Sequence, residues 1–263
     1  MNETAEVTGV VLSSMPIGEY DRRVLLLTRE RGKISAFARG ARKPGSPLMA
    51  SSRPCTFARF YLYEGRNAYT VQRAEPIRYF EEFSADVEGV SYACYFMELS
   101  EYYTKENMES TQLLNLLFVS FKALLRDSIP NALVRRIFEL RIMTINGEYP
   151  QVSCCTACGK PVSAGYYSIR RSSLFCTDCA AQISDPMWLE ESVVYTLNYI
   201  ITAPLEKLFT FQLKEEIYQK VEYVVEQHKQ RYIDKEFHSL EILNMMDQPI
   251  ICQKGLEKQE KKG

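Results

Sequence analysis

The first 80 residues alternate hydrophobic and polar positions in short runs, which is the period-two pattern of half-buried β-strands. Turns rich in Gly, Pro or charged residues separate five such runs, at residues 6–12, 23–28, 33–39, 56–63 and 68–75. The first of these turns is expected at Met15–Glu19. Five short strands in a segment of this length indicate a small closed barrel. The five-stranded OB-fold is the leading candidate, and an SH3-like barrel is the alternative.

Past Pro76 and the acidic pair at 81–82, the hydrophobic period becomes that of α-helices. The stripe that we expect the first helix to bury consists of Val87, Val90, Cys94 and Met97. A second helix, beginning near Ser110, is hydrophobic nearly all round, so it is predicted to be central and buried. Further helices are expected at 131–145, 192–202, 213–232 and 237–243.

Two CxxC pairs interrupt the helical pattern. Cys155 and Cys158 form the first pair, and Cys176 and Cys179 follow after a spacer of 17 residues, in which 166–169 and 173–175 are predicted short strands. This spacing is typical of a four-thiolate zinc site, and Gly159 suits the tight turn of such a knuckle. A closed shell of four thiolates leaves no position for water, so the predicted zinc ion is structural. A redox CxxC motif and an iron–sulfur cluster are the alternatives.

The remaining four of the eight cysteines are less informative. Cys154 adjoins Cys155 and is an alternative ligand, although the CxxC spacing favours Cys155. Cys55, Cys94 and Cys252 lie far apart in the chain and are interpreted as small buried hydrophobic residues or idle thiols.

The composition is that of a globular protein, with 46% hydrophobic and 25% charged residues. A polar, acidic start lacks the features of a secretory signal, and no hydrophobic run approaches the ~20 residues of a membrane span. These features predict a cytoplasmic protein with no membrane partner. The net charge of −1 conceals an asymmetry, because residues 1–80 hold 13 Lys and Arg against 7 Asp and Glu. A basic N-terminal module on an acidic remainder favours a polyanion as ligand.

Basic residues of the barrel are therefore the candidate DNA contacts. The segment Arg39–Lys43 carries three cations beside small residues, so a phosphate chain could approach its backbone closely. The residues that we assign to DNA binding are Arg22, Arg23, Lys33, Arg39, Arg42, Lys43 and Arg59. Aromatic residues could stack on bases, as OB-folds do with single strands, or could equally belong to the barrel core; they are Phe37, Phe57, Phe60, Tyr61, Tyr63 and Tyr69.

Catalytic signatures are poor, since GxSxG, HExxH and GxxxxGK[ST] do not occur in the sequence. The two histidines, His228 and His238, fall in predicted helices and are interpreted as surface or packing residues. The acidic pairs 190–191 and 215–216 are interpreted as solvated or first-turn residues of helices. The sequence therefore predicts a protein that is not an enzyme.

Taken in order, these features resemble the bacterial recombination mediator family RecO. The segment Leu25–Lys33 leading into Arg39–Lys43, the four spaced cysteines and the late Ser239–Leu243 carry the resemblance, which covers nearly the whole chain. It implies an α+β multidomain fold with an N-terminal OB-fold and an all-helical domain that carries an inserted zinc finger. It also implies binding of single- and double-stranded DNA, annealing of complementary strands, and loading of the RecA recombinase together with RecR.

The implied partners also include, in some lineages, the C-terminal tail of the single-strand-binding protein, and the implied location is the nucleoid. The predicted divisions are an OB-fold at 1–80, a helical domain at 81–149 and 181–250, a four-cysteine zinc insertion at 150–180 and a disordered tail at 251–263. Two other classes of function stay open at this point. One is a zinc-ribbon interaction adaptor without a DNA role, and the other is a nuclease or RNA-modifying enzyme, against which the missing metal cluster of acidic or histidine residues argues.

Overall fold

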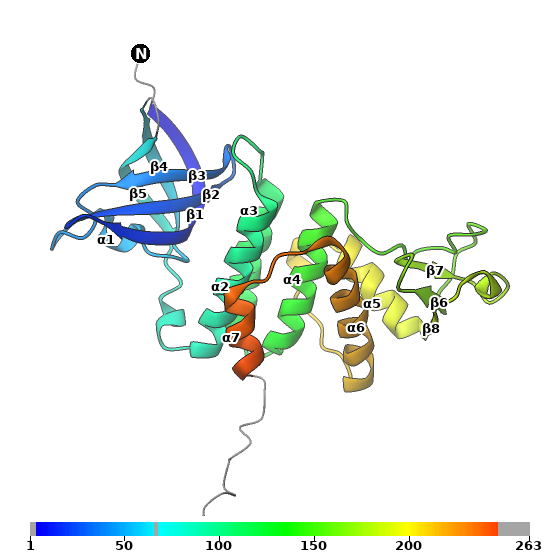
Figure 1. Cartoon of the computed structure of the whole chain (residues 1–263). Coiled ribbons are helices and arrows are strands. Elements are labelled where there is room, and N and C mark those ends of the chain that lie inside the picture. The colour runs from blue at the N-terminus through cyan, green and yellow to red at the C-terminus, as the bar shows by residue number, and fades with distance from the viewer. Residues whose placement is uncertain (1–3, 66–67, 247–263) are drawn as a thin grey trace, which may run out of the picture.

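The computed structural model describes residues 4–65 and 68–246, so the predicted tail at 251–263 lies outside the described residues. Five strands close into a barrel in the order β1-β2-β3-β5-β4 (Figure 1). They are β1 (Thr4–Ile17), β2 (Asp21–Thr28), β3 (Gly32–Ala38), β4 (Phe57–Glu64) and β5 (Tyr69–Arg78). Neighbouring strands are antiparallel except β3 and β5, which are parallel. This is the five-stranded OB-fold barrel that the alternating pattern predicted.

Inward-facing residues of all five strands form the barrel core, which includes Val7, Leu26, Ile34, Phe60 and Val71. β1 is long enough to pair with β4 through its first half and with β2 through its second. A register shift between Val11 and Ser13 marks the change of partner, since such irregularities let a strand bend around a barrel.

Two proline positions were predicted wrongly as the ends of strands. Pro16 pairs with Arg22 inside β1, so the first turn begins at Gly18 rather than at Met15. Pro76 pairs with Ala58 inside β5, which continues to Arg78. At both places the proline-bearing strand has a paired strand on one side only. The missing N–H of proline therefore costs no ladder hydrogen bond.

A helical array follows the barrel (Figure 1). The helices are α2 (Val87–Tyr103), α3 (Thr111–Leu124), α4 (Asn131–Ile145), α5 (Glu191–Thr202), α6 (Glu215–Tyr232) and α7 (His238–Met246). Short elements also occur at α1 (Leu48–Ser51), η1 (Glu81–Ser84), η2 (Ala180–Gln182) and η3 (Leu205–Lys207). No helix of residues 4–65 and 68–246 combines the length and the hydrophobicity that crossing a membrane requires.

The most enclosed helix is α4, which contacts α2, α3, α5 and α6, whereas the sequence placed α3 at the centre. α3 is buried on two sides because it lies between the barrel and α4, and this explains why hydrophobic residues surround it. The stripe predicted for α2 is also displaced. Val87 is 71% exposed, and the buried surface is formed instead by Tyr92, Tyr95, Phe96 and Leu99. Because α7 and α4 both pack on α2, more of its circumference is buried than one stripe provides.

The barrel and the helices share one hydrophobic core. Phe57 of β4 meets Phe118 and Phe121 of α3 edge to face, with ring centroids 5.0 and 5.9 Å apart, and Phe80 packs beside them. At the same junction the β2–β3 turn is hydrogen-bonded to the α2–α3 loop. Lys33 N donates to Lys105 O at 3.2 Å. Gly32 has φ +63°, and a Cβ there would lie 2.2 Å from Lys105 O, so this junction requires glycine.

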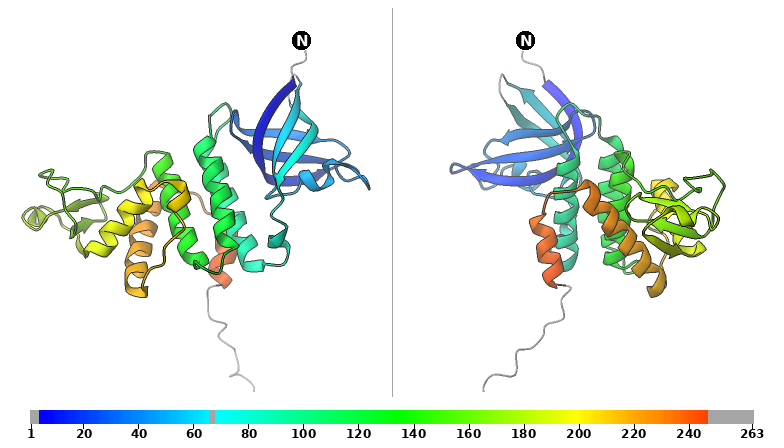
Figure 2. Two further views of the ribbon diagram at one scale, coloured as in Figure 1. Left: turned by 180° about the vertical axis from the view of Figure 1, so that it is seen from behind. Right: turned by 45° about the vertical axis from the view of Figure 1, so that its right-hand side comes forward.

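A small ribbon lies at the end of the array opposite the barrel, and the two stay apart in every view (Figure 2). Its strands are β6 (Gly165–Ser168), β7 (Ser173–Phe175) and β8 (Pro186–Leu189), in the order β7-β6-β8. The sequence predicted the first two and missed β8. Tyr167, Leu174 and Leu189 of the ribbon belong to the main hydrophobic core, so the ribbon is anchored on the helices.

Candidate metal centre and nucleic-acid interface

The four cysteines of the CxxC pairs converge at the tip of the ribbon. The sulfur atoms of Cys155, Cys158, Cys176 and Cys179 all lie within 4.8 Å of one another. Cys158 Sγ and Cys176 Sγ are 3.8 Å apart, which equals the edge of about 3.8 Å in a tetrahedron with metal–sulfur bonds of about 2.3 Å. The four side chains could therefore hold a metal ion. Cys154 is outside this group, and its segment pairs with Pro161 instead.

Local backbone geometry turns each pair toward the cluster. Gly159, with φ +74°, donates its N–H to Cys155 O at 2.8 Å and closes the first knuckle. Cys179 N donates to Cys176 O at 3.1 Å in the second knuckle. Burial would raise the pKa of Cys155, but N–H groups of Cys176, Cys158 and Ala157 donate to its sulfur and lower that pKa to about 6. A backbone that favours thiolate at the most buried position suits metal binding.

The basic loop after β3 packs against the turn between β1 and β2. Asp21 Oδ1 accepts the Gly40 N–H at 2.7 Å, and Arg42 donates through its backbone N–H to Tyr20 O at 2.8 Å. Lys43 lies over the Tyr20 ring at 5.4 Å. Arg39, Arg42 and Lys43 form no ion pair with a carboxylate of the described residues. The loop therefore presents three uncompensated cations on the side of the barrel away from the ribbon (Figure 1).

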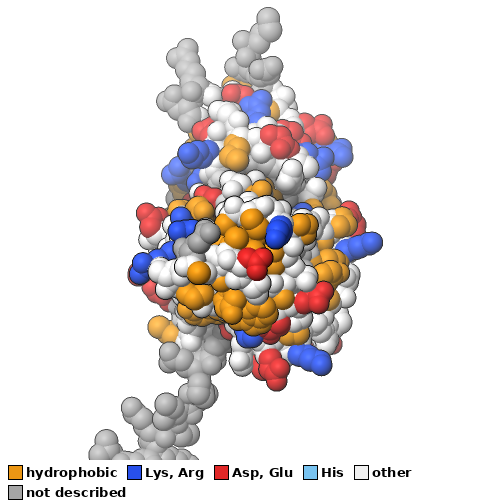
Figure 3. Space-filling view, turned by 90° about the vertical axis from the view of Figure 1, so that its right-hand side faces the viewer, with side chains coloured by type: hydrophobic (Ala, Val, Ile, Leu, Met, Phe, Trp, Pro, Cys, Tyr) orange, Lys and Arg blue, Asp and Glu red, His pale blue; other side chains and the backbone are white. Residues whose placement is uncertain are grey.

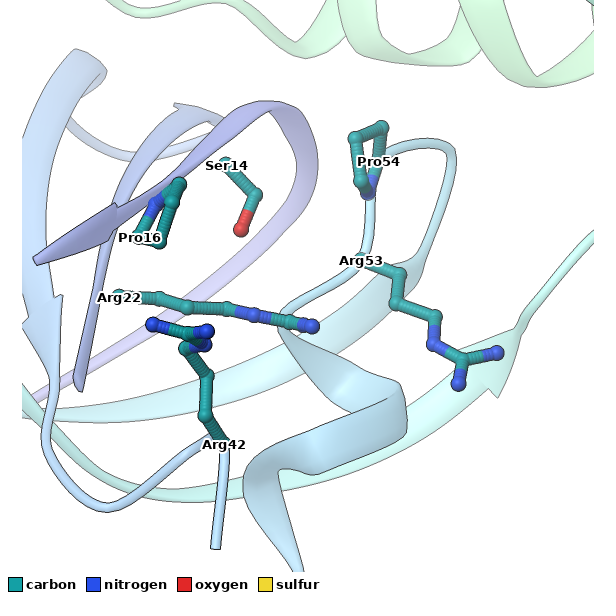
Figure 4. Close-up of a pocket in the computed structure, with 6 residues that line it drawn as sticks. All are labelled: Ser14, Pro16, Arg22, Arg42, Arg53 and Pro54. Atoms are coloured by element: carbon teal, nitrogen blue, oxygen red, sulfur yellow. The ribbon is translucent and has the colours of Figure 1, made fainter. Parts of the chain in front are cut away.

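Arg22 and Arg42 line a hollow of about 220 Å³ beside this loop, together with Arg53, Ser14, Pro16 and Pro54. The guanidinium groups of Arg22 and Arg42 lie next to each other, and the Ser14 hydroxyl points toward them (Figure 4). Arg53 reaches the hollow from the opposite rim with its head group turned outward (Figure 4). Sequence reasoning missed Arg53. Its position depends on the segment before β4 pairing with β1, through Cys55 N to Val11 O, which no local pattern reveals.

The other assigned cations lie elsewhere on the barrel. Arg23 projects from the outer face of β2 and donates to Ser35 Oγ at 2.8 Å. Lys33 stands at the far end of β3, where it donates to Glu101 O at 3.0 Å, and is thus held against α2. Arg59 of β4 pairs with Glu6 at 3.2 Å. The structure thus brings together Arg22, Arg39, Arg42 and Lys43, and it separates Lys33 and Arg59 from them.

The aromatic residues divide between core and surface. Phe57 and Phe60 are buried, which is the core alternative. Tyr61 lies under the Arg73 guanidinium at 4.1 Å, and the Tyr69 hydroxyl accepts a hydrogen bond from Arg31. A surface row that the sequence did not suggest runs across three strands. Met15, which is 65% exposed, pairs with Arg23, and Arg23 pairs with Phe37.

The face at the ribbon end has a different character. Hydrophobic and uncharged side chains cover much of it, and its Lys and Arg are interspersed with Asp and Glu (Figure 3). Exposed aromatic residues of the ribbon and of α5 include Trp188 and Tyr195, at 44% and 67% exposure. This face therefore lacks the concentrated positive charge of the barrel loops.

A buried ion cluster ties α4 to α6, and no pattern in the sequence indicated it. Glu139 is fully buried and accepts hydrogen bonds from Arg135 Nε at 3.1 Å, Arg136 Nη1 at 2.8 Å and Lys229 Nζ at 3.2 Å. The Tyr95 hydroxyl donates to the same carboxylate at 2.7 Å. Burial alone would raise the pKa of Glu139, but Arg136, Lys229 and Arg135 outweigh it and hold that pKa well below its ordinary value. Glu139 is therefore ionised and fully paired at neutral pH.

Both histidines have structural surroundings. His228 is buried, with its ring 4.9 Å from that of Tyr232 and its Nδ1 3.1 Å from Ser172 Oγ. Burial lowers the pKa of His228 to about 4, so the ring is neutral near pH 7. His238 is exposed beside Glu241. Of the remaining cysteines that the structure describes, Cys55 is buried and Cys94 is half-buried, whereas Cys252 lies outside the described residues.

Two family models cover most of the chain. Recombination protein O N terminal matches residues 1–80, and Recombination protein O C terminal matches residues 84–241. A DNA repair protein RecO from Alkaliphilus metalliredigens is 31% identical over 236 residues, covering 89% of this chain and 96% of that protein. A DNA repair protein RecO from Acetivibrio thermocellus is 28% identical over 243 residues, covering 92% and 97%. The similarity therefore includes the barrel, the helices and the ribbon.

Proposed function

Since this chain belongs to the recombination protein O (RecO) family, and so has a role in DNA repair and recombination, we propose that it binds single- and double-stranded DNA on its barrel. It would anneal complementary strands and, with RecR, help load the RecA recombinase. The observation that carries this proposal is the group of uncompensated cations at Arg39, Arg42 and Lys43 on an OB-fold.

The proposed mechanism is electrostatic capture followed by base stacking. Phosphates replace condensed counterions along the basic loop, and the released counterions drive binding. The exposed row of Met15, Arg23 and Phe37 offers flat and hydrophobic contacts to unstacked bases beside the loop. Because neutralised strands no longer repel each other, binding in this way favours pairing of two complementary strands. A DNA ligand would also place the protein at the nucleoid in the cytoplasm.

The helical array would then serve as a docking platform for proteins of the repair machinery. In this division of the chain, residues 1–80 bind DNA, 81–149 and 181–250 bind partners, and 150–180 form a metal-stabilised insertion. RecR and the C-terminal tail of the single-strand-binding protein are the proposed partners. The mixed charge and exposed aromatic residues of the ribbon face support a protein ligand there rather than a phosphate chain (Figure 3).

A salt titration tests the DNA proposal. The logarithm of the binding constant for a single-stranded oligonucleotide is expected to fall linearly with the logarithm of salt concentration, by about 0.7 per phosphate contacted. Fluorescence anisotropy at several salt concentrations measures this slope, and an annealing assay with and without RecR follows the strand-pairing step. An affinity that hardly changes between low and moderate salt would contradict electrostatic capture, and a flat titration would favour an adaptor without a DNA role.

The four-cysteine cluster is proposed to hold one structural zinc ion, because four thiolates in tetrahedral arrangement suit zinc and close its coordination shell. Cys158→Ser is expected to remove the metal and open the ribbon to proteolysis, while the affinity for DNA changes less than about twofold, within the ~0.5 kcal/mol typical of distant substitutions. Elemental analysis, limited proteolysis and a DNA titration of the purified variant measure these three effects.

Cys154→Ser is the matched control for this experiment, because Cys154 is the neighbouring cysteine outside the cluster. It should retain one equivalent of zinc. Loss of metal in Cys154→Ser with retention in Cys158→Ser would assign the ligands differently. Brown colour and visible absorbance would instead indicate an iron–sulfur cluster.

A further inference from the structure

The hollow beside the basic loop has a concentration of positive charge that a simple phosphate-tracking groove does not need. Arg22, Arg42 and Arg53 all line it, and none of the three forms an ion pair with a carboxylate of the described residues. Asp21, the carboxylate beside the loop, accepts the Gly40 N–H. The like charges are felt at Arg22, whose pKa is lowered by burial and by the nearby Arg53 and Arg42. An anion in the hollow would relieve this repulsion.

Arg22 is held in place for such a role. Its Nη1 donates to Met49 O at 3.1 Å and to Ser52 Oγ at 2.9 Å, which fixes the guanidinium against α1. Both bonds use Nη1, and a guanidinium carries five N–H donors, so further donors remain for a ligand. Arg42 is tied to the neighbouring turn by its bond from Nη1 to Gly18 O at 3.2 Å. Two of the three guanidinium groups are thus positioned before any ligand binds.

A second observation points to a polar ligand in the hollow. The Ser14 Oγ is buried and has no hydrogen-bond partner among the residues that the structure describes, and it points toward the two guanidinium groups (Figure 4). A buried hydroxyl without a partner costs free energy, which a ligand oxygen would recover. Pro16 and Pro54 complete the lining. Because proline has no backbone N–H, the donors that face the hollow come from the arginines and the serine.

We infer that this hollow binds the terminal phosphomonoester of a DNA strand, so that the protein recognises phosphorylated strand ends. This inference rests on the DNA binding proposed above. A terminal phosphate carries a charge of about −1.5 to −2 near pH 7, whereas each internal phosphodiester carries a single charge. Three guanidinium groups around one hollow match the higher charge and its three free oxygens. A terminal group also has only one connection to the strand, so it can enter a hollow end-on.

Arg53 would complete the site by turning inward. Its head group points outward from the rim in the free protein, and an exposed side chain changes rotamer on the picosecond to nanosecond timescale (Figure 4). Arg53 therefore distinguishes this site from the general basic surface. Its loss should remove recognition of the end while the loop cations continue to hold the strand.

Equilibrium titrations with one internally labelled oligonucleotide in three forms test the inference. The forms carry a 5′-phosphate, a 3′-phosphate or hydroxyls at both ends, and fluorescence anisotropy is measured at ~0.15 M ionic strength. At least one phosphorylated form should bind about tenfold more tightly than the hydroxyl form, which is the effect of one charge-assisted hydrogen bond. The arm with the tighter binding identifies which end the hollow accepts.

Arg53→Gln is the diagnostic variant and Arg126→Gln is its matched control, since Arg126 is an arginine beyond α3 in the helical array. Arg53→Gln should abolish the preference for the phosphorylated end and keep the affinity for the hydroxyl form within about twofold, the range of substitutions outside a contact. Arg126→Gln should keep the preference.

Equal affinities of the wild-type protein for all three forms would overturn the inference and leave DNA binding intact. A preference that persists in Arg53→Gln would also overturn it, because the phosphate would then bind elsewhere. If no form binds, the proposed function fails and this inference fails with it.

Discussion

Replacing Glu139 with glutamine is expected to lower the free energy of unfolding by about 3–5 kcal/mol, the usual cost of removing one partner of a buried ion pair. Glu139 is fully buried and accepts hydrogen bonds from Arg135, Arg136 and Lys229, whose side chains are 7–8% exposed. Glutamine preserves the shape but removes the charge, so three buried cations would face only Glu222 and Glu226. Urea unfolding followed by far-ultraviolet circular dichroism measures the change.

Glu222→Gln is the matched control for this substitution. Glu222 binds Arg136 from the same cluster at 2.7 Å, but its side chain is 37% exposed, so water can compensate for the lost charge. The expected loss is about 1 kcal/mol or less. The deficit of Glu139→Gln should also persist in concentrated salt, because buried charges are poorly screened. A Glu139→Gln loss no greater than that of Glu222→Gln would show that water reaches the cluster.

Reversing the three loop charges, with Arg39→Glu, Arg42→Glu and Lys43→Glu, is expected to weaken single-strand binding by about 100-fold or more at 0.15 M salt. Each phosphate contact contributes roughly fivefold through counterion release at that salt concentration, and reversal adds repulsion to the loss of three contacts. The salt slope should fall by about 3, one for each cation lost. Fluorescence anisotropy measures both quantities, and circular dichroism checks that the barrel is folded.

A second triple reversal controls for net charge, since any change of this size makes the whole protein more acidic. Arg126, Lys207 and Lys214 belong to the helical part, so reversing them changes the charge equally. This control should retain most of its affinity for DNA. Equal losses in the two triples would mean that overall charge governs binding, and wild-type affinity in the loop triple would place the DNA site elsewhere.

The barrel and the cysteine cluster could be predicted from the sequence because their signals are local. The alternation along each strand reports which side faces the core, and glycine-containing turns mark its ends. The CxxC spacing places two sulfur atoms near each other whatever the rest of the chain does. Both proline errors, at Pro16 and Pro76, have one origin. Whether proline ends a strand depends on whether that strand has neighbours on both sides, and only the closed barrel shows this.

The features that escaped prediction depend on contacts between distant segments. Arg135, Arg136 and Glu139 have the composition of a solvated helix face, yet α6 covers them with Glu222, Glu226 and Lys229. The third arginine of the hollow, Arg53, was overlooked for the same reason. The buried surface of α2 was misplaced because tyrosines, which count weakly as hydrophobic, supply much of it.

The aromatic junction at Phe57, Phe80, Phe118 and Phe121, together with the close approach at Gly32, leaves no pivot between the barrel and the helices. A hinge would have to break a continuous hydrophobic core and the backbone hydrogen bonds of the β2–β3 turn. A strand bound to the barrel therefore keeps a constant heading and reach relative to any protein held at the helical end. Such a protein would receive the strand in one fixed orientation, as from a rigid bracket rather than from a tether.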